Sequence, residues 1–167
     1  NVFGKRLSFF FNAHNNLFEE VAKFRAARRM WARIIKNRFK AKDKKSLLMR
    51  FHTQTAGVSL TAQQPENNIV RIAMQALSAV MAGVDYLSIQ AYDNLSTSGS
   101  NILSQRMAIN ISHLLKEEAQ VRFINNPFNN SFAIENLSFK LAALGWQTFQ
   151  DLDGYANWLN AEKLDKI

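Results

Sequence analysis

The 167-residue sequence contains no cysteine, which excludes disulfide bonds and cysteine-ligated zinc and fits the cytoplasm or the mitochondrial matrix of a eukaryote. No apolar run approaches the ~18 residues that span a bilayer, so we expect no membrane partner. The motifs GxGxxG, GxxxxGK and HExxH are absent, and the three histidines have no metal-ligand spacing. We therefore expect no metal ligands in this chain.

Acidic residues are nearly missing from one stretch. Between Lys23 and Arg50 lie twelve of the 21 basic residues and one acid, Asp43. This stretch has a net charge of +11 and the rest of the chain −3, which together give the net charge of +8. A basic cluster favours a phosphate-bearing partner, but we prefer the interpretation of a solvated helix face. We do not expect nucleic-acid binding, because the same helix carries Phe24 and Trp31 on a packing face.

Three similar stretches organise the chain. They read RLSFFF at residues 6–11, LLMRFHTQ at 47–54 and YLSIQ at 86–90. Their apolar residues predict strands near 7–11, 47–53 and 84–91, which gives a repeat of about forty residues, the length of one strand–helix unit.

Helical patterns follow each predicted strand. We expect helices over residues 17–39, 65–83, 102–118 and 133–152, and a short last helix holding Tyr155, Trp158 and Leu159. Asn16 and Glu19 have capping-box spacing, Pro65 suits a first helical turn and Gly83 suits a helix end. The alternation predicts an α/β fold with a parallel sheet and right-handed crossovers. No linker composition interrupts the chain, so we expect one domain over 1–167.

Polar residues near the ends of the predicted strands are the candidate functional groups. We expect His14 and His52 just past strand ends, on the edge where parallel α/β proteins place their sites. Gln54 and Gln90 have similar positions. From the residues alone, these side chains either hydrogen-bond a ligand or satisfy loop backbone.

Two stretches carry a resemblance to a known family. RLSFFFNAHNNLFEEVAKFRAARRMWA at 6–32 and RFHTQTAGVSLTAQQPENNIVR at 50–71 resemble the adenosylcobalamin-dependent acyl-CoA mutases, the methylmalonyl-CoA mutase family. The segment NNPFNNSFAIENLSFKLAALGWQTFQDLD at 125–153 also resembles the end of that family's barrel domain. The resemblance implies the last three strand–helix units of a TIM-type (β/α)₈ barrel, followed by a C-terminal helical segment.

The resemblance also implies roles for single positions. Arg6 and Ser8 match residues that contact coenzyme A along the barrel axis, and Phe10 matches an aromatic residue near the acyl group. His52 and Gln54 match positions at the barrel mouth that face the corrin ring of adenosylcobalamin.

The third strand departs from the catalytic pattern of the family. Catalytic chains usually read like QSLHTNSLDEA, whereas residues 85–95 read DYLSIQAYDNL, with Gln90 and Asn94 at the corrin-facing positions. Asp85 and Gln90 look more like the family's inert small subunits. The family's active-site histidine and its DxHxxG cobalamin-binding segment have no counterpart here, so we expect no catalytic residue, no cobalamin-binding domain and no turnover by this chain alone.

Two functions follow from the resemblance. The chain is either part of an isomerase, an intramolecular transferase that rearranges the carbon skeleton of a short acyl-CoA by radical chemistry, or a non-catalytic barrel segment that only assembles with a catalytic chain. Its expected partners are the acyl-CoA substrate, the remaining barrel units, a cobalamin-binding domain or subunit that holds most of the cofactor, and a second copy in a dimer.

Overall fold

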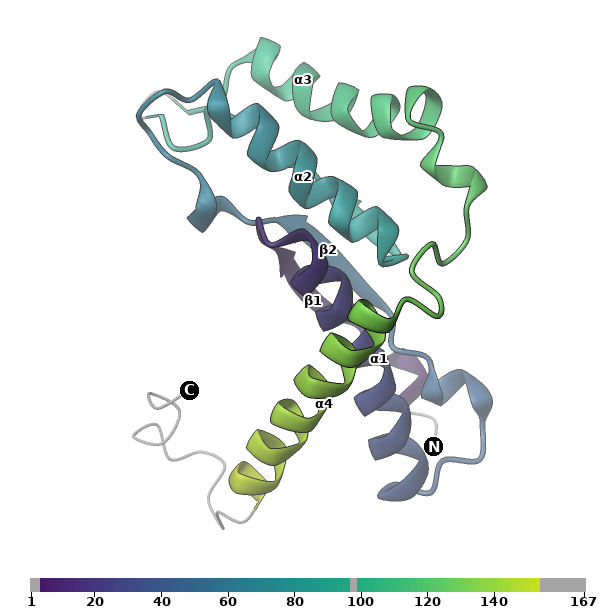
Figure 1. Ribbon diagram of the computed structural model, residues 1–167. Coiled ribbons are helices and arrows are strands. Elements are labelled where there is room, and N and C mark those ends of the chain that lie inside the picture. The colour runs from purple at the N-terminus through teal and green to yellow at the C-terminus, as the bar shows by residue number, and fades with distance from the viewer. Residues whose placement is uncertain (1–3, 97–98, 154–167) are drawn as a thin grey trace.

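The computed structural model describes residues 4–96 and 99–153 and contains a three-stranded parallel sheet with strand order β1-β2-β3 (Figure 1). β1 spans Phe9–Ala13, β2 spans Phe51–Thr55 and β3 spans Tyr86–Ser88. The crossovers are α1, Leu17–Asn37, and α2, Asn67–Met81. The predicted parallel strand–helix repeat is confirmed. The predicted last helix around Trp158 lies outside the described residues.

The predicted strand boundaries are wrong at both ends of each strand. Residues 7–8 and 48–50 only lead into the strands, and 3₁₀-helices precede them, η1 at Gly4–Arg6 and η2 at Lys44–Leu47. In η2 the backbone N–H of Lys45 donates to Asp43 Oδ1 at 2.8 Å, which stabilises the turn. An apolar run shows that a segment is buried, but only pairing with a neighbouring strand decides where the ladder begins.

Aromatic rings attach α1 to the face of the sheet that the helices cover. Phe24 of α1 is fully buried and stacks on Phe51 of β2, with ring centroids 5.3 Å apart. Phe11 of β1 meets both rings edge-on, at 6.0 and 5.2 Å. Aromatic pairs in these geometries add to the free energy of burial, so this triad fixes the distance between helix and sheet.

The helix ends follow the sequence signals only in part. The predicted capping box is wrong, because the Asn16 side chain makes no bond to the backbone and donates to Glu19 Oε2 at 2.6 Å. Pro65 lies in the turn before α2 rather than inside the helix. Gly83 ends α2 as predicted: its φ is +67°, and its N–H donates to Val80 O at 2.9 Å.

Two further helices complete the described chain. α3, Ile102–His113, continues into a wider π-helical turn, η4, at Leu114–Glu118, and packs beside α2. α4, Phe132–Asp153, lies across α1 (Figure 1). No helix within residues 4–96 and 99–153 is long and apolar enough to cross a membrane.

Ion pairs join α4 to α1. Glu135 of α4 accepts hydrogen bonds from Arg25 and Arg29, which are one helical turn apart on α1. The hydrogen bond from Arg29, together with the nearby charges of Arg29 and Arg25, holds the pKa of the Glu135 carboxyl below its usual value. Part of the basic stretch is therefore engaged between helices, which corrects the interpretation of a solvated helix face.

Glu135→Gln should make the stability of the fold less sensitive to acid. A carboxyl whose pKa is lower in the folded state adds stability above its unfolded pKa of about 4.3, and loses it as the pH falls through the folded value. The variant should be less stable than the wild type at neutral pH, and the difference should vanish in acid. Urea unfolding at a series of pH values measures this, and two parallel pH curves would contradict it.

Candidate functional site

Within residues 4–96 and 99–153, the helices leave one face of the sheet open. Successive side chains of a strand point to opposite faces of the sheet. α1 and α2 cover the face that carries Phe11 and Phe51, and the alternate side chains point to the other face. The register places this second set in two rows across the sheet. The rows are Phe10, His52 and Tyr86, and then Asn12, Gln54 and Ser88. We call these six residues the open face. In a closed barrel, such a face would line the interior.

Two predicted ligand groups meet on the open face. The Phe10 and His52 rings stack with centroids 5.1 Å apart and an interplanar angle of 25°. Phe10 is 60% exposed, which is high for a phenylalanine within a sheet. The described part of the chain gives the His52 and Gln54 side chains no hydrogen-bond partner, so their polar atoms are available to a ligand.

The strand positions of His52 and Gln54 differ from the prediction. Both lie inside β2 rather than past its end. His14 does follow the last residue of β1, and its Nδ1 lies 3.4 Å from Ser59 Oγ. The β2 ladder starts and ends later than the apolar pattern indicated, which brings Gln54 into the sheet beside His52.

Arg6 and Ser8 lie at the amino end of β1. Arg6 is the last residue of η1, not a strand residue, and is exposed. Ser8 is exposed and precedes β1 directly. The predicted substrate residues thus run from the amino end of β1 to Phe10 within it.

Gln90 and Asn94 pair with each other beyond β3. Asn94 Nδ2 donates to Gln90 Oε1 at 3.2 Å, and the Gln90 backbone N–H donates to Thr55 Oγ1 at 2.9 Å. A Cβ on Gly57 would lie 2.9 Å from Gln90 Oε1, so the bare glycine backbone makes room for this amide. Unlike Gln54, these two side chains have their amides partly engaged.

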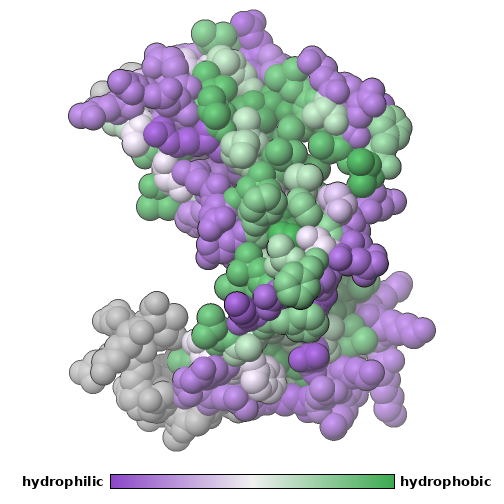
Figure 2. Space-filling model, viewed as in Figure 1, coloured by the Kyte–Doolittle hydropathy of each residue, from purple (hydrophilic) through white to green (hydrophobic). Residues whose placement is uncertain are grey.

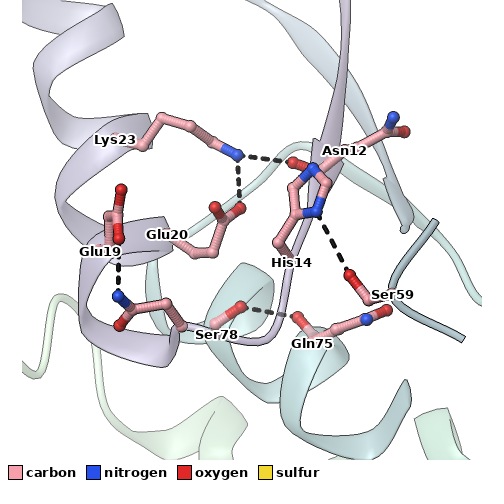
Figure 3. A network of polar contacts seen from close by, with 9 residues as sticks. Asn12, His14, Glu19, Glu20, Lys23, Ser59, Gln75 and Ser78 are labelled. Atoms are coloured by element: carbon pink, nitrogen blue, oxygen red, sulfur yellow. Dashed lines mark hydrogen bonds and ion pairs between the residues drawn. The ribbon is translucent and has the colours of Figure 1, made fainter. Parts of the chain in front are cut away.

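A polar network supports the carboxyl edge of the sheet (Figure 3). Lys23 Nζ donates to Asn12 O at 2.7 Å and pairs with Glu20, which is 5% exposed. Gln75 of α2 is fully buried and donates to Asn15 Oδ1 at 2.6 Å, tying α2 to the loop after β1. Sequence reasoning missed these residues. The signal in the sequence that could have found Gln75 is its position among the apolar residues of α2, which indicates a buried amide that needs a partner.

The described chain offers no metal site, since nowhere within it do three His, Asp or Glu side chains come together suitably. What the open face offers is hydrogen-bonding amides, an imidazole and an aromatic ring. Such a surface can bind a large polar ligand by several weak contacts.

Comparison with known proteins identifies relatives for nearly the whole chain. The family described as "Methylmalonyl-CoA mutase" matches residues 1–161. A methylmalonyl-CoA mutase from Rhizobium meliloti is 38% identical over 159 residues, which cover 95% of this chain and 22% of that protein. The mitochondrial enzyme of Mus musculus is 40% identical over 136 residues, covering 81% of this chain and 18% of that protein. A probable mitochondrial methylmalonyl-CoA mutase from Caenorhabditis elegans is 35% identical over 153 residues, which cover 92% of this chain and 20% of that protein. The chain thus spans about a fifth of the length of these relatives.

Proposed function

The chain belongs to the methylmalonyl-CoA mutase family, and from this membership we propose that it forms part of an adenosylcobalamin-dependent mutase that isomerises a short acyl-CoA. The observation that carries the proposal is the open face, which no helix of the described chain covers and whose side chains are polar or aromatic. A sheet face directed only at a core would be apolar. This segment would provide one part of the barrel wall.

The substrate side of the proposal uses the amino end of β1. An arginine is always charged and its planar fork can bind a phosphate through two hydrogen bonds, so exposed Arg6 suits a phosphate of coenzyme A. Ser8 would add a hydroxyl, and Phe10 an apolar surface for the acyl group. These residues follow one another in the chain from the end of η1 into β1, so one extended ligand would contact all three.

The cofactor side of the proposal uses the open face and the loop after β3. His52 and Gln54 have polar atoms free for the peripheral amides of a corrin ring, and Gln90 and Asn94 lie near the same carboxyl edge. These four side chains would hold the ring through hydrogen bonds to its amides. When bound, adenosylcobalamin supplies the radical chemistry, while the protein binds, orients and excludes water.

A second candidate function is favoured by the hydrogen bond between Gln90 and Asn94. Amides that bind each other have fewer free groups for a corrin. This observation fits a non-catalytic barrel segment that assembles with a catalytic chain.

Partners are proposed from the surface. β1 and β3 are the two edges of the sheet, and strand edges pair readily with further strands. Figure 2 shows apolar side chains gathered over the region of α2 and α3. Of the residues of these helices, Val70 is 65% exposed and Ile102 85%. Patches of this kind mark protein contacts. We propose that the remaining barrel units, a cobalamin-binding domain or subunit and a second copy in a dimer are the partners, in the cytoplasm or mitochondrial matrix.

A chimera tests the proposed function. In it, this chain replaces the matching segment of the Rhizobium meliloti mutase, and isomerisation of methylmalonyl-CoA is measured with added adenosylcobalamin. The catalytic proposal predicts turnover. It further predicts that replacing His52 with phenylalanine and Gln54 with leucine weakens cofactor binding about tenfold or more, since each lost hydrogen bond contributes ~1 kcal/mol.

The matched control replaces Asn110 with leucine, because Asn110 is exposed on α3, away from the open face. A folded chimera that binds acyl-CoA but has no turnover would favour the non-catalytic segment. Unchanged cofactor affinity in the His52 and Gln54 variant would contradict the proposed corrin contacts.

A further inference from the structure

A cleft beside α1 holds an excess of arginine that the proposed function does not use. It is lined by Arg25, Arg28 and Arg29 of α1, by the end of α2 at residues 80–83, and by residues 121, 122 and 124–127. The segment that links α3 to α4 passes beside α1 to form its outer wall (Figure 1). Among the residues that the structure describes, none that lines the cleft is acidic.

Two of these arginines share one carboxylate. Arg25 and Arg29 both bind Glu135, and Arg25 Nη1 also donates to Asn126 Oδ1 at 2.6 Å. Two positive charges therefore face one negative charge, and the group of Arg25, Arg29 and Glu135 has a net charge of +1. Because Arg25 is only 15% exposed, solvent screens this charge less than it would on an open helix.

The other two arginines have separate partners. Arg28 donates to the carbonyls of Ala82 and Gly83, which offsets the negative end of α2, and lies 3.9 Å from Asp85. Arg122 pairs with Glu117 at 3.0 Å on the rim. The four guanidiniums thus meet three carboxylates, all of which lie outside the lining of the cleft.

Two N–H donors of these arginines are unused within the described residues. Nε of Arg25 and Nη1 of Arg29 are buried there without an acceptor. Buried polar groups are nearly always hydrogen-bonded, and an unpaired one on a charged group is costly enough to require an explanation. Arg25 and Arg29 both line the cleft, so these donors belong to side chains that a ligand in the cleft would contact.

We propose that this cleft binds a small tetrahedral oxyanion, phosphate or sulfate. Such an anion supplies the missing charge and presents several acceptor oxygens, which guanidinium groups bind in a fixed geometry. Chloride matches the charge but gives no directed oxygens. A carboxylate has only two oxygens in one plane. The cleft lies on the helical side of the sheet, so this site is separate from the open face.

Isothermal titration of the purified protein with inorganic phosphate tests the proposal, with the ionic strength held constant by chloride. We expect saturable one-to-one binding, and the same with sulfate. The double substitution Arg25→Lys with Arg29→Lys keeps both charges and the pairing with Glu135 but removes the two free N–H groups. It should weaken phosphate binding at least tenfold, whereas Arg33→Lys, on the exposed part of the same helix, should not.

Glu135→Gln gives a change of opposite sign. It removes the shared carboxylate, so phosphate should bind several-fold more tightly, and this variant keeps the proposal testable if the double substitution fails to fold. Absence of saturable phosphate binding, or equal affinity in wild type and double variant, would overturn the proposal and assign the two donors to water. Loss of acyl-CoA binding in the double variant would overturn the separation from the open face.

Discussion

Phe24→Ala should lower the free energy of unfolding by about 3–5 kcal/mol, the usual cost of removing a buried phenylalanine. Phe24 is fully buried, stacks on Phe51 and meets Phe11 edge-on. Its loss leaves a cavity between α1 and the sheet that the flanking rings cannot fill. Urea unfolding of wild type and variant measures the difference.

Phe39→Ala is the matched control, because Phe39 lies just past the end of α1 and is 62% exposed. Its cost should stay near the ~0.5 kcal/mol typical of surface substitutions. Equal losses for the two variants would show that the aromatic triad does not hold the helix on the sheet.

Arg6→Ala, made in the chimeric mutase, should weaken acyl-CoA binding about 10- to 100-fold, because a hydrogen bond to a charged group contributes ~1.5–3 kcal/mol. Arg6 is exposed at the end of η1, shortly before β1, and Ser8 and Phe10 are exposed as well. Binding of a non-reacting acyl-CoA, measured by titration, separates this effect from changes in turnover.

Arg33→Ala provides the comparison for Arg6. Arg33 belongs to the basic stretch but lies on α1, on the far side of the sheet from the open face. It should leave acyl-CoA affinity unchanged. If both variants lose affinity equally, the basic helix and not the start of β1 binds the phosphates of the substrate.

The sequence predicted the order of elements well. The apolar stretches around Phe11, Phe51 and Leu87 all became parallel strands, because only burial on a shared sheet makes such runs stable between helices. Gly83 ended α2 as predicted, since a left-handed residue is needed there and glycine adopts that backbone without strain. Local signals of this kind depend on neighbouring residues alone.

The site was predicted less completely. The residues that the family resemblance indicated, Phe10 and His52, do lie side by side, and their functional roles stay predictions. Arg6 was expected directly before a strand and lies in a 3₁₀-helix that ends three residues before β1. Gly57, which makes room for Gln90, and Gln75, which ties α2 to a loop, were not found, because their partners are distant in the sequence.

The sequence by itself determined the strand–helix repeat, the family resemblance and the position of the basic stretch, because each depends on the type and spacing of residues. Only the tertiary structure decided which side chains face the open side, since that follows from the register in which Phe10, His52 and Tyr86 align across three strands. It also decided that Arg25 and Arg29 meet Glu135 from more than a hundred residues away. Charge along a chain is a local property, whereas pairing between helices depends on how the whole chain packs.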